Sequence, residues 1–394
     1  MNGSERWSAV GIRVTILCSI LNMFDGINIF TLTYLAPSLQ KQFHAGAEGF
    51  SIVFSAGLAG MAFGGLVVAT QADKFGRRPV IFLALGLMGL AMIWSAFAPS
   101  ILMLAISRLF VGVGIGAVLA SISALSASFA PDRLRNMAVG LPQAGYPLGA
   151  AAAGFLTAWA LPIYGWSAIF LSAGILTLSL IPICLFLLPE AREAESPVRY
   201  TIAQAIGGSR LANSSLIWVC TISGFMALYF IASWVTKLAI QAGLPQTQAI
   251  IASAIYSGGA VVGTIVVSVA ATRFPIGRLA AIMCVLAAGS FLVFGGVKMP
   301  VGPLLLTSFF IGIALQGGVN AIYPLTAGAY PPEARATGLG WAMGIGRLGA
   351  FLGPLVGGWA IGQGLPLVAV FGIFCVPLII AATAALNVRT LAPA

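Results

Sequence analysis

The 394-residue chain is 60% hydrophobic and only 7% charged, and its formal net charge is +10. Because an ordinary soluble domain is about a quarter charged, this composition excludes a water-soluble protein. Apolar runs of about 20 residues recur along the chain, and each is long enough to cross a bilayer as a helix. We therefore expect an all-α membrane protein. Its basic residues lie in short loops, where they set orientation and do not form a nucleic-acid site.

Charged residues, prolines and glycines divide the apolar sequence into twelve predicted transmembrane spans. Their limits are about 12–35, 50–72, 79–98, 101–129, 136–160, 165–188, 213–238, 248–271, 278–297, 302–329, 336–361 and 366–389. The longest polar stretch runs from Pro189 to Arg210 and separates two sets of six spans. The sequence therefore predicts an N-terminal six-helix bundle over 1–190, a cytoplasmic linker over 191–212 and a C-terminal six-helix bundle over 213–394.

Lysine and arginine are unequally distributed between the two sides of the predicted membrane. Fourteen lie in the termini and in the loops of one side, whereas the opposite loops hold only Lys41, Lys237 and Lys298. Positive residues concentrate on the cytoplasmic side, so both termini are expected to be cytoplasmic.

The two halves also resemble each other at an offset of 200 residues. Pro131 and Arg135, in a loop of the first half, align with Pro331 and Arg335 in the second. Two similar six-helix bundles are typical of secondary transporters, whose substrate site lies between the repeats near the bilayer midplane. The repeat therefore predicts a transporter with two pseudo-symmetric bundles.

Three charged residues lie well inside the predicted spans: Asp25, Arg108 and Arg347. An ionisable group in hydrocarbon costs at least about 2.5 kcal/mol, so each is a candidate functional residue. Asp25 and Arg347 each follow a cytoplasmic arginine by twelve residues, which places them about 18 Å into the membrane. Burial favours the neutral form of a carboxyl group, so Asp25 is predicted to carry a proton, with Arg108 as the second proton-coupling candidate. A planar guanidinium binds a carboxylate through two parallel hydrogen bonds, so Arg347 is predicted to anchor an anion, and the alternative for all three is structural pairing.

Polar and aromatic residues in the spans are candidate walls of a substrate cavity. Gln316, Asn320 and Tyr323 are spaced at i, i+4 and i+7, so they share one helix face. Lipid would leave the amide groups of this face without hydrogen-bond partners. Asn22 and Asn28 flank the acid of the first span at three-residue spacing. Aromatic side chains that can stack on a substrate ring are Tyr146, Tyr229, Trp234, Tyr256 and Trp341, although such residues more often serve packing.

The loop between the second and third spans reads ADKFGRRP and resembles the G-x-x-x-D-[RK]-x-G-R-[RK] motif of the major facilitator superfamily. The resemblance implies a conformational latch, which we call the loop latch, made of Asp73, Lys74, Gly76, Arg77 and Arg78. Glycine permits the tight turn, and the aspartate can accept hydrogen bonds from the arginines. A basic loop that only sets topology is the alternative. Glycine patterns in the fourth and eleventh spans, RLFVGVGIGA and GRLGAFLGPLVGG, are similar to two further motifs of the superfamily.

Two segments are similar to the aromatic acid:proton symporter family within that superfamily. MFDGINIFTLTYLAPSL, from Met23 to Leu39, resembles the family's D-G-x-D run before an Ala-Pro, and YPPEARATGLGWAMGIGRLGAFLGP, from Tyr330 to Pro354, resembles its R-A-T-G-x-G-W…G-x-G-R-x-G-A stretch. The second acid of D-G-x-D is Asn28 in this chain, so proton coupling is expected to rest on Asp25. The resemblance implies import of a small aromatic carboxylate with protons, by alternating access, across a bacterial inner membrane.

Two other transport functions stay open: import of a non-aromatic organic anion, such as muconate or a sugar acid, and drug/proton antiport. The Gly-Pro motif of efflux proteins is matched only loosely by GLPQAGYPLGA in the fifth span, which counts against antiport. The sequence contains no visible metal-ligand cluster, nucleophile–base arrangement or phosphate loop, so we expect no enzyme activity, cofactor or metal. The expected partners are a small organic anion, protons and the lipid bilayer, without nucleic acid, and the protein is expected to be a monomer.

Overall fold

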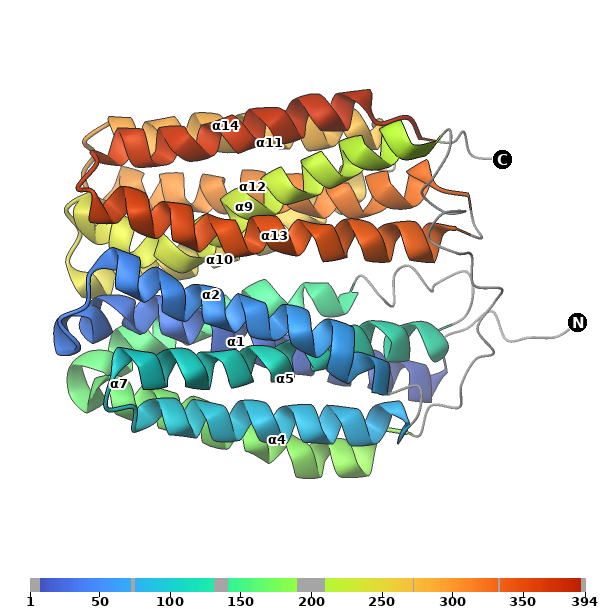
Figure 1. The fold of residues 1–394 in the computed structure, drawn as a ribbon, viewed down its shortest axis with the longest axis horizontal. Helices are drawn as coiled ribbons and strands as arrows, with labels where there is room; N and C mark the ends of the chain where they lie inside the picture. The colour runs from blue at the N-terminus through green and yellow to red at the C-terminus, as the bar shows by residue number, and fades with distance from the viewer. Residues whose placement is uncertain are drawn as a thin grey trace, which may run out of the picture. The chain divides into compact units, whose positions relative to one another are not determined.

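The computed structural model describes residues 8–71, 75–130, 141–189, 210–271, 273–331 and 334–390. Within these ranges the chain forms helices joined by short turns, and no strand occurs there. The helices form two compact units, one within Met1–Ala194 and one within Glu195–Ala394 (Figure 1). The expected all-α membrane fold is therefore confirmed.

The first unit pairs its helices in a simple pattern. Its helices are α1 (Ala9–Gln42), α2 (Ala47–Phe63), α4 (Arg77–Ala96), α5 (Ile101–Ser128) and α7 (Gly145–Leu187). α2 continues into a π-helical turn, Gly64–Val68, and a 3-10 turn, Ala69–Gln71. α1 packs mainly on α7 and α2 on α5, and α4 contacts both α5 and α7.

The second unit repeats this pattern. Its helices are α9 (Leu211–Gln241), α10 (Gln246–Ala270), α11 (Ile276–Gly296), α12 (Val301–Ala329), α13 (Arg335–Gly362) and α14 (Leu367–Asn387). α9 packs mainly on α13 and α10 on α12, and α11 contacts both α12 and α14. Each pairing has its counterpart in the first unit, with α13 and α14 together corresponding to the long α7.

Close backbone contacts recur at matching positions of the two units. A Cβ atom at Gly60 would overlap the carbonyl oxygen of Leu109, and one at Gly259 would overlap that of Phe309. One helical turn further on, Gly64 approaches Val113 just as Gly263 approaches Ile313. Small residues therefore set the α2–α5 and α10–α12 distances at the same level of each unit. The sequence repeat is thus also a structural repeat.

A buried aromatic donor ties the first helix of each unit to its main partner. In the first unit, the Tyr34 hydroxyl donates to the Ala150 carbonyl of α7 at 2.6 Å. In the second, the Trp234 indole nitrogen donates to the Pro354 carbonyl of α13 at 3.0 Å. Tyr34 and Trp234 are 200 positions apart, and both side chains are fully buried. Trp234 therefore packs inside its unit and is not a wall of an open cavity.

α7 holds the two spans predicted at 136–160 and 165–188, as two helical parts that separate at Gly165. It is one element of 43 residues in which only Gly165, with φ 75° and ψ 174°, leaves the helical range. Glycine adopts this left-handed φ without strain, so one residue suffices to reverse the chain. The parts on either side of Gly165 each contain about the 20 residues needed to cross a bilayer. Within the described residues, eleven helices are long and apolar enough to span a membrane, with this double-length helix counted once.

Candidate functional site

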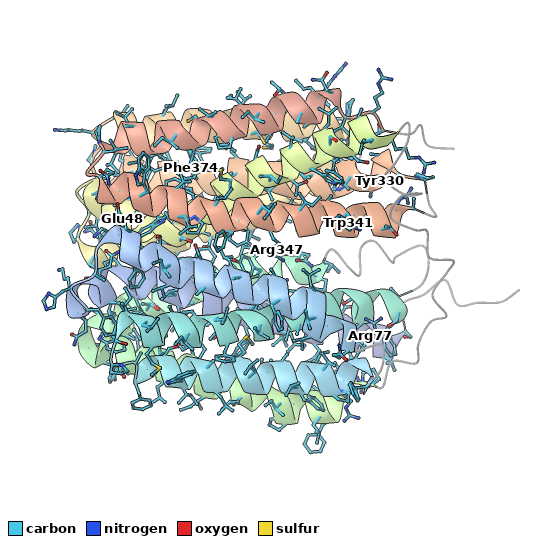
Figure 2. All side chains as sticks on the ribbon, viewed as in Figure 1. Glu48, Arg77, Tyr330, Trp341, Arg347 and Phe374 are labelled. Atoms are coloured by element: carbon cyan, nitrogen blue, oxygen red, sulfur yellow. The ribbon has the colours of Figure 1, made fainter. Side chains whose placement is uncertain are left out.

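The packing of α13 on α9 positions Arg347. This residue lies about midway along α13 (Figure 2). Two residues further on, Gly349 has no room for a side chain, because a Cβ atom there would overlap the carbonyl oxygen of Ile222 on α9. The close approach brings the guanidinium to α9, where Nη1 donates to the Tyr229 hydroxyl at 3.1 Å. The glycine pattern of the eleventh span therefore sets the place of the predicted anion anchor.

Two tyrosines accompany Arg347 in the second unit. Tyr229 packs against Phe225 with ring centroids 6.0 Å apart. Tyr323 on α12 lies within electrostatic range of both Arg347 and Tyr229, and its side chain is 42% exposed. We call Arg347, Tyr229 and Tyr323 the arginine–tyrosine cluster. It combines a cation, two hydroxyl donors and two ring faces, and Tyr323 is not packed away, which suits a small aromatic anion.

The predicted polar stripe of α12 extends from this cluster. Gln316 Nε2 donates to Asn320 Oδ1 at 3.1 Å, and Asn320 Nδ2 donates to Thr264 Oγ1 of α10 at 2.7 Å. The Thr264 hydroxyl in turn donates to the Ala260 carbonyl at 2.8 Å. We call Gln316, Asn320 and Thr264 the amide relay. Both amides are half-buried, so the stripe is a polar face of the second unit and is not packed away.

Asp25 lies in the first unit, on α1, and its side chain is fully buried. Neither carboxylate oxygen has a hydrogen-bond or ion-pair partner among the residues that the structure describes. Gly26 follows, and a Cβ atom there would overlap the carbonyl oxygen of Tyr146, so α7 is almost in contact with the backbone beside the acid. An ionised carboxylate without donors is costly to bury. This arrangement therefore suits a protonated Asp25.

Arg108 reaches the same stretch of α1 from α5. Its side chain is only 3% exposed, and Nη2 donates to Ser95 Oγ at 2.7 Å. Nη1 lies 3.4 Å from the carbonyl oxygen of Asn28, three residues after the acid, and the guanidinium stacks 4.6 Å from the Phe170 ring centroid. All of these partners are neutral. Arg108 is thus a buried cation beside Asp25's helix, held by dipoles and an aromatic ring.

Asn22, Asn28 and Tyr146, which we predicted to bind substrate, make contacts inside the first unit. Asn22 donates to the Pro142 carbonyl at 2.7 Å, and Asn28 donates to Thr177 Oγ1 at 3.1 Å. Both asparagines are fully buried. The Tyr146 ring packs on Phe30 with centroids 5.9 Å apart. These contacts join α1 to α7 and to the residues just before it, and a substrate role for the three residues stays a prediction.

Comparison with known proteins assigns the chain to a family. The sequence model of the Major Facilitator Superfamily matches residues 18–322 and 217–393. The chain belongs to the major facilitator superfamily. It is therefore a multi-pass membrane transporter and not an enzyme.

Two relatives within the superfamily are named for aromatic acids. A gallate transporter of Pseudomonas putida is 30% identical over 406 residues, which cover 95% of this chain and 90% of that protein. The 4-hydroxybenzoate transporter PcaK of Pseudomonas aeruginosa is 29% identical over 410 residues, covering 95% and 91%. The resemblance to the aromatic acid symporters is therefore confirmed.

The fold has a close counterpart among solved structures. A bacterial homologue of the human lysosomal transporter Spinster, in an inward-facing and occupied conformation, matches with a TM-score of 0.78 over 97% of each chain. The two sequences are only 16% identical, so this likeness concerns the fold alone.

The superfamily loop motif is only partly covered by the structure. Asp73 and Lys74 of the loop latch lie outside the described residues. Gly76 has a φ of 86° directly before α4, which is the turn that the motif's glycine was predicted to make. Arg78 donates to the Leu185 carbonyl at the end of α7 and stacks 5.6 Å from the Phe82 ring centroid. Arg77 follows Gly76 as the first residue of α4.

Two predicted aromatic residues differ in exposure, and their substrate roles stay predictions, whereas one polar residue was not predicted. Tyr256 is 1% exposed and belongs to the packed interior. Trp341 is 40% exposed, but it lies six residues before Arg347, which separates the two side chains by about 120° around α13. Thr264 was missed because nothing in the pattern of α10 singles out one hydroxyl. Only its bond to Asn320 reveals its place in the amide relay.

Proposed function

We propose that the chain imports a small aromatic carboxylate together with protons by alternating access. The observation that carries this proposal is the arginine–tyrosine cluster. Arg347 offers the paired donors that a carboxylate prefers, and the two tyrosines offer ring faces beside it. Both relatives are named for acids of this class, which supports an aromatic carboxylate as the substrate.

Proton coupling is proposed to depend on Asp25. The acid lies in the first unit without a hydrogen-bond or ion-pair partner among the described residues, where binding a proton removes the cost of a buried charge. Arg108, held by neutral partners next to the same helix, is proposed to favour the ionised acid when the proton leaves. Proton binding and anion binding then occur on different units, and the alternating movement couples them.

For the orientation and organisation of the protein, we propose what the sequence predicts. We propose a bacterial inner-membrane location with both termini in the cytoplasm, because fourteen basic residues lie on that side. The linker over 191–212 joins the bundles of 1–190 and 213–394, and the transporter acts as a monomer. The loop latch, through Asp73, is proposed to stabilise one conformation.

A binding screen on the purified protein tests this function. Benzoate, hydroxybenzoates, phenylpropanoids and muconate are titrated by calorimetry into the detergent-solubilised transporter. We expect saturable binding of aromatic acids, and no binding of their amides or of cationic drugs. Binding of muconate without any aromatic acid would favour the non-aromatic alternative, and binding of cationic drugs alone would favour antiport.

A further inference from the structure

The amide relay has a fixed hydrogen-bond direction. The Ala260 carbonyl can only accept, so the single hydroxyl hydrogen of Thr264 points to it. The Thr264 oxygen can then only accept a hydrogen bond from Asn320. The amide nitrogen of Asn320 therefore faces Thr264 on α10, and its amide oxygen faces Gln316. Gln316 must therefore donate with Nε2, as its 3.1 Å bond to Asn320 shows. One backbone carbonyl thus orients two side-chain amides.

This direction leaves the Gln316 oxygen as a free acceptor. Gln316 Oε1 accepts no hydrogen bond from the residues that the structure describes, and the side chain is half-buried. An amide oxygen facing hydrocarbon would go unsatisfied, so the face that carries it is open to water or ligand. A site that presents an acceptor binds a group that can donate.

The acceptor lies close to the arginine–tyrosine cluster. Gln316, Asn320 and Tyr323 share one face of α12, and the bond to Asn320 turns the Gln316 amide toward Tyr323. The amide is then within about one helical turn, roughly 5 Å, of the level of Tyr323. Tyr323 itself lies within electrostatic range of Arg347. A carboxylate at Arg347 would therefore direct the ring of an aromatic acid along the stripe.

We propose that Gln316 Oε1 accepts a hydrogen bond from a ring hydroxyl of the substrate, with Asn320 and Thr264 as positioning residues. The chain then selects hydroxylated aromatic acids over acids whose ring substituent cannot donate. The reason is that an acid without a donating ring substituent displaces water from Gln316 Oε1 and leaves that oxygen without a hydrogen bond. This inference rests on the proposed function, because it needs a carboxylate held at Arg347.

Ligands of matched size test the acceptor on the unmodified protein. The 3- and 4-substituted hydroxy-, amino- and fluorobenzoates are titrated into the purified transporter, since hydroxyl and amino groups donate and fluorine does not. We expect at least one hydroxy isomer and its amino counterpart to bind about two- to ten-fold more tightly than the fluoro acid. Equal affinities across both positions would overturn the acceptor role while leaving the proposed function intact. Absence of binding by every acid in the series would overturn both.

Three variants then locate the selectivity. Gln316→Met removes the acceptor at similar length, and Thr264→Val removes the hydroxyl that orients the relay. Thr307→Val is the matched control, because among the described residues the Thr307 hydroxyl contacts the Pro303 carbonyl and the Met299 sulfur, at 2.8 and 3.8 Å, and neither belongs to the amide relay. We expect the hydroxy-to-fluoro affinity ratio to approach one in the first, to fall in the second and to persist in the control. An unchanged ratio in Gln316→Met would overturn the proposal, and if that variant does not fold, an unchanged ratio in Thr264→Val does so.

Discussion

Replacing Arg347 with alanine is expected to weaken binding of the substrate carboxylate by about ten- to a hundred-fold. The guanidinium is held at the face of the second unit by its 3.1 Å bond to Tyr229, so its fork is oriented before the anion arrives. A hydrogen bond to a charged group contributes about 1.5–3 kcal/mol, and each 1.4 kcal/mol changes affinity tenfold. A hydrogen bond at the low end of this range corresponds to about a ten-fold loss of affinity, and one at the high end to about a hundred-fold loss.

Two milder variants separate charge from geometry. Arg347→Lys keeps the charge but loses the planar two-donor fork, so binding should weaken by less than in the alanine variant. Tyr229→Phe keeps the ring but removes the hydroxyl that orients Nη1, so we expect a smaller loss, of about two- to ten-fold. If Arg347 is the anchor, Arg347→Ala binds the carboxylate most weakly, Arg347→Lys binds it more tightly and Tyr229→Phe binds it most tightly of the three.

Calorimetric titration with an acid and its matching amide measures the effect. 4-Hydroxybenzoate and 4-hydroxybenzamide have the same ring, so their affinity ratio reports the carboxylate contact alone. Arg278→Ala is the matched control, since Arg278 is an exposed arginine near the start of α11. A folded Arg347→Ala protein that keeps the wild-type preference for the acid over the amide would refute the anchor role.

Three further predictions concern coupling, turnover and packing. Asp25→Asn should abolish accumulation in proteoliposomes while counterflow exchange survives, and accumulation by this variant would show that protons bind elsewhere. Asp73→Asn should slow the transport rate severalfold with substrate affinity within a few-fold, whereas an unchanged rate would reduce the loop latch to a topology signal. Gly349→Ala should lower stability by about 1–3 kcal/mol in thermal unfolding, because its Cβ atom overlaps the Ile222 carbonyl. Gly340→Ala, which meets nothing within 4 Å on the same helix, is its control, and equal unfolding temperatures for the two would contradict the packing argument.

The fold could be predicted largely because membrane helices obey length and hydropathy. Eleven helices of membrane-spanning length occur where the sequence predicts spans, and Leu109 and Phe309, whose carbonyl groups Gly60 and Gly259 approach, repeat the 200-residue offset. The break within α7 could also be predicted, because the spans at 136–160 and 165–188 meet next to Gly165, the one residue of α7 that leaves the helical range. Which residue makes the break could not be predicted, because a single glycine with positive φ leaves no polar signal in an apolar run.

The candidate site was predicted unevenly for a similar reason. Charge in an apolar span is a strong signal, so Arg347 and Asp25 could be identified, and helical spacing was enough to unite Gln316, Asn320 and Tyr323. Partners on other helices carry no such signal, which is why Thr264 was missed. Residue type alone also cannot separate exposed from buried amides, and Asn22 proved to be fully buried, with its amide donating to the Pro142 carbonyl.

Uptake driven by an imposed proton gradient tests the central claim most directly. Proteoliposomes with an acidic exterior and alkaline interior are given labelled 4-hydroxybenzoate, and liposomes that contain the Arg347→Ala variant correct for acid that crosses the lipid unaided. We predict accumulation above this background that disappears when a protonophore collapses the gradient. Gradient-independent uptake, or accumulation equal to that of the Arg347→Ala liposomes, would contradict proton-coupled import of an aromatic carboxylate.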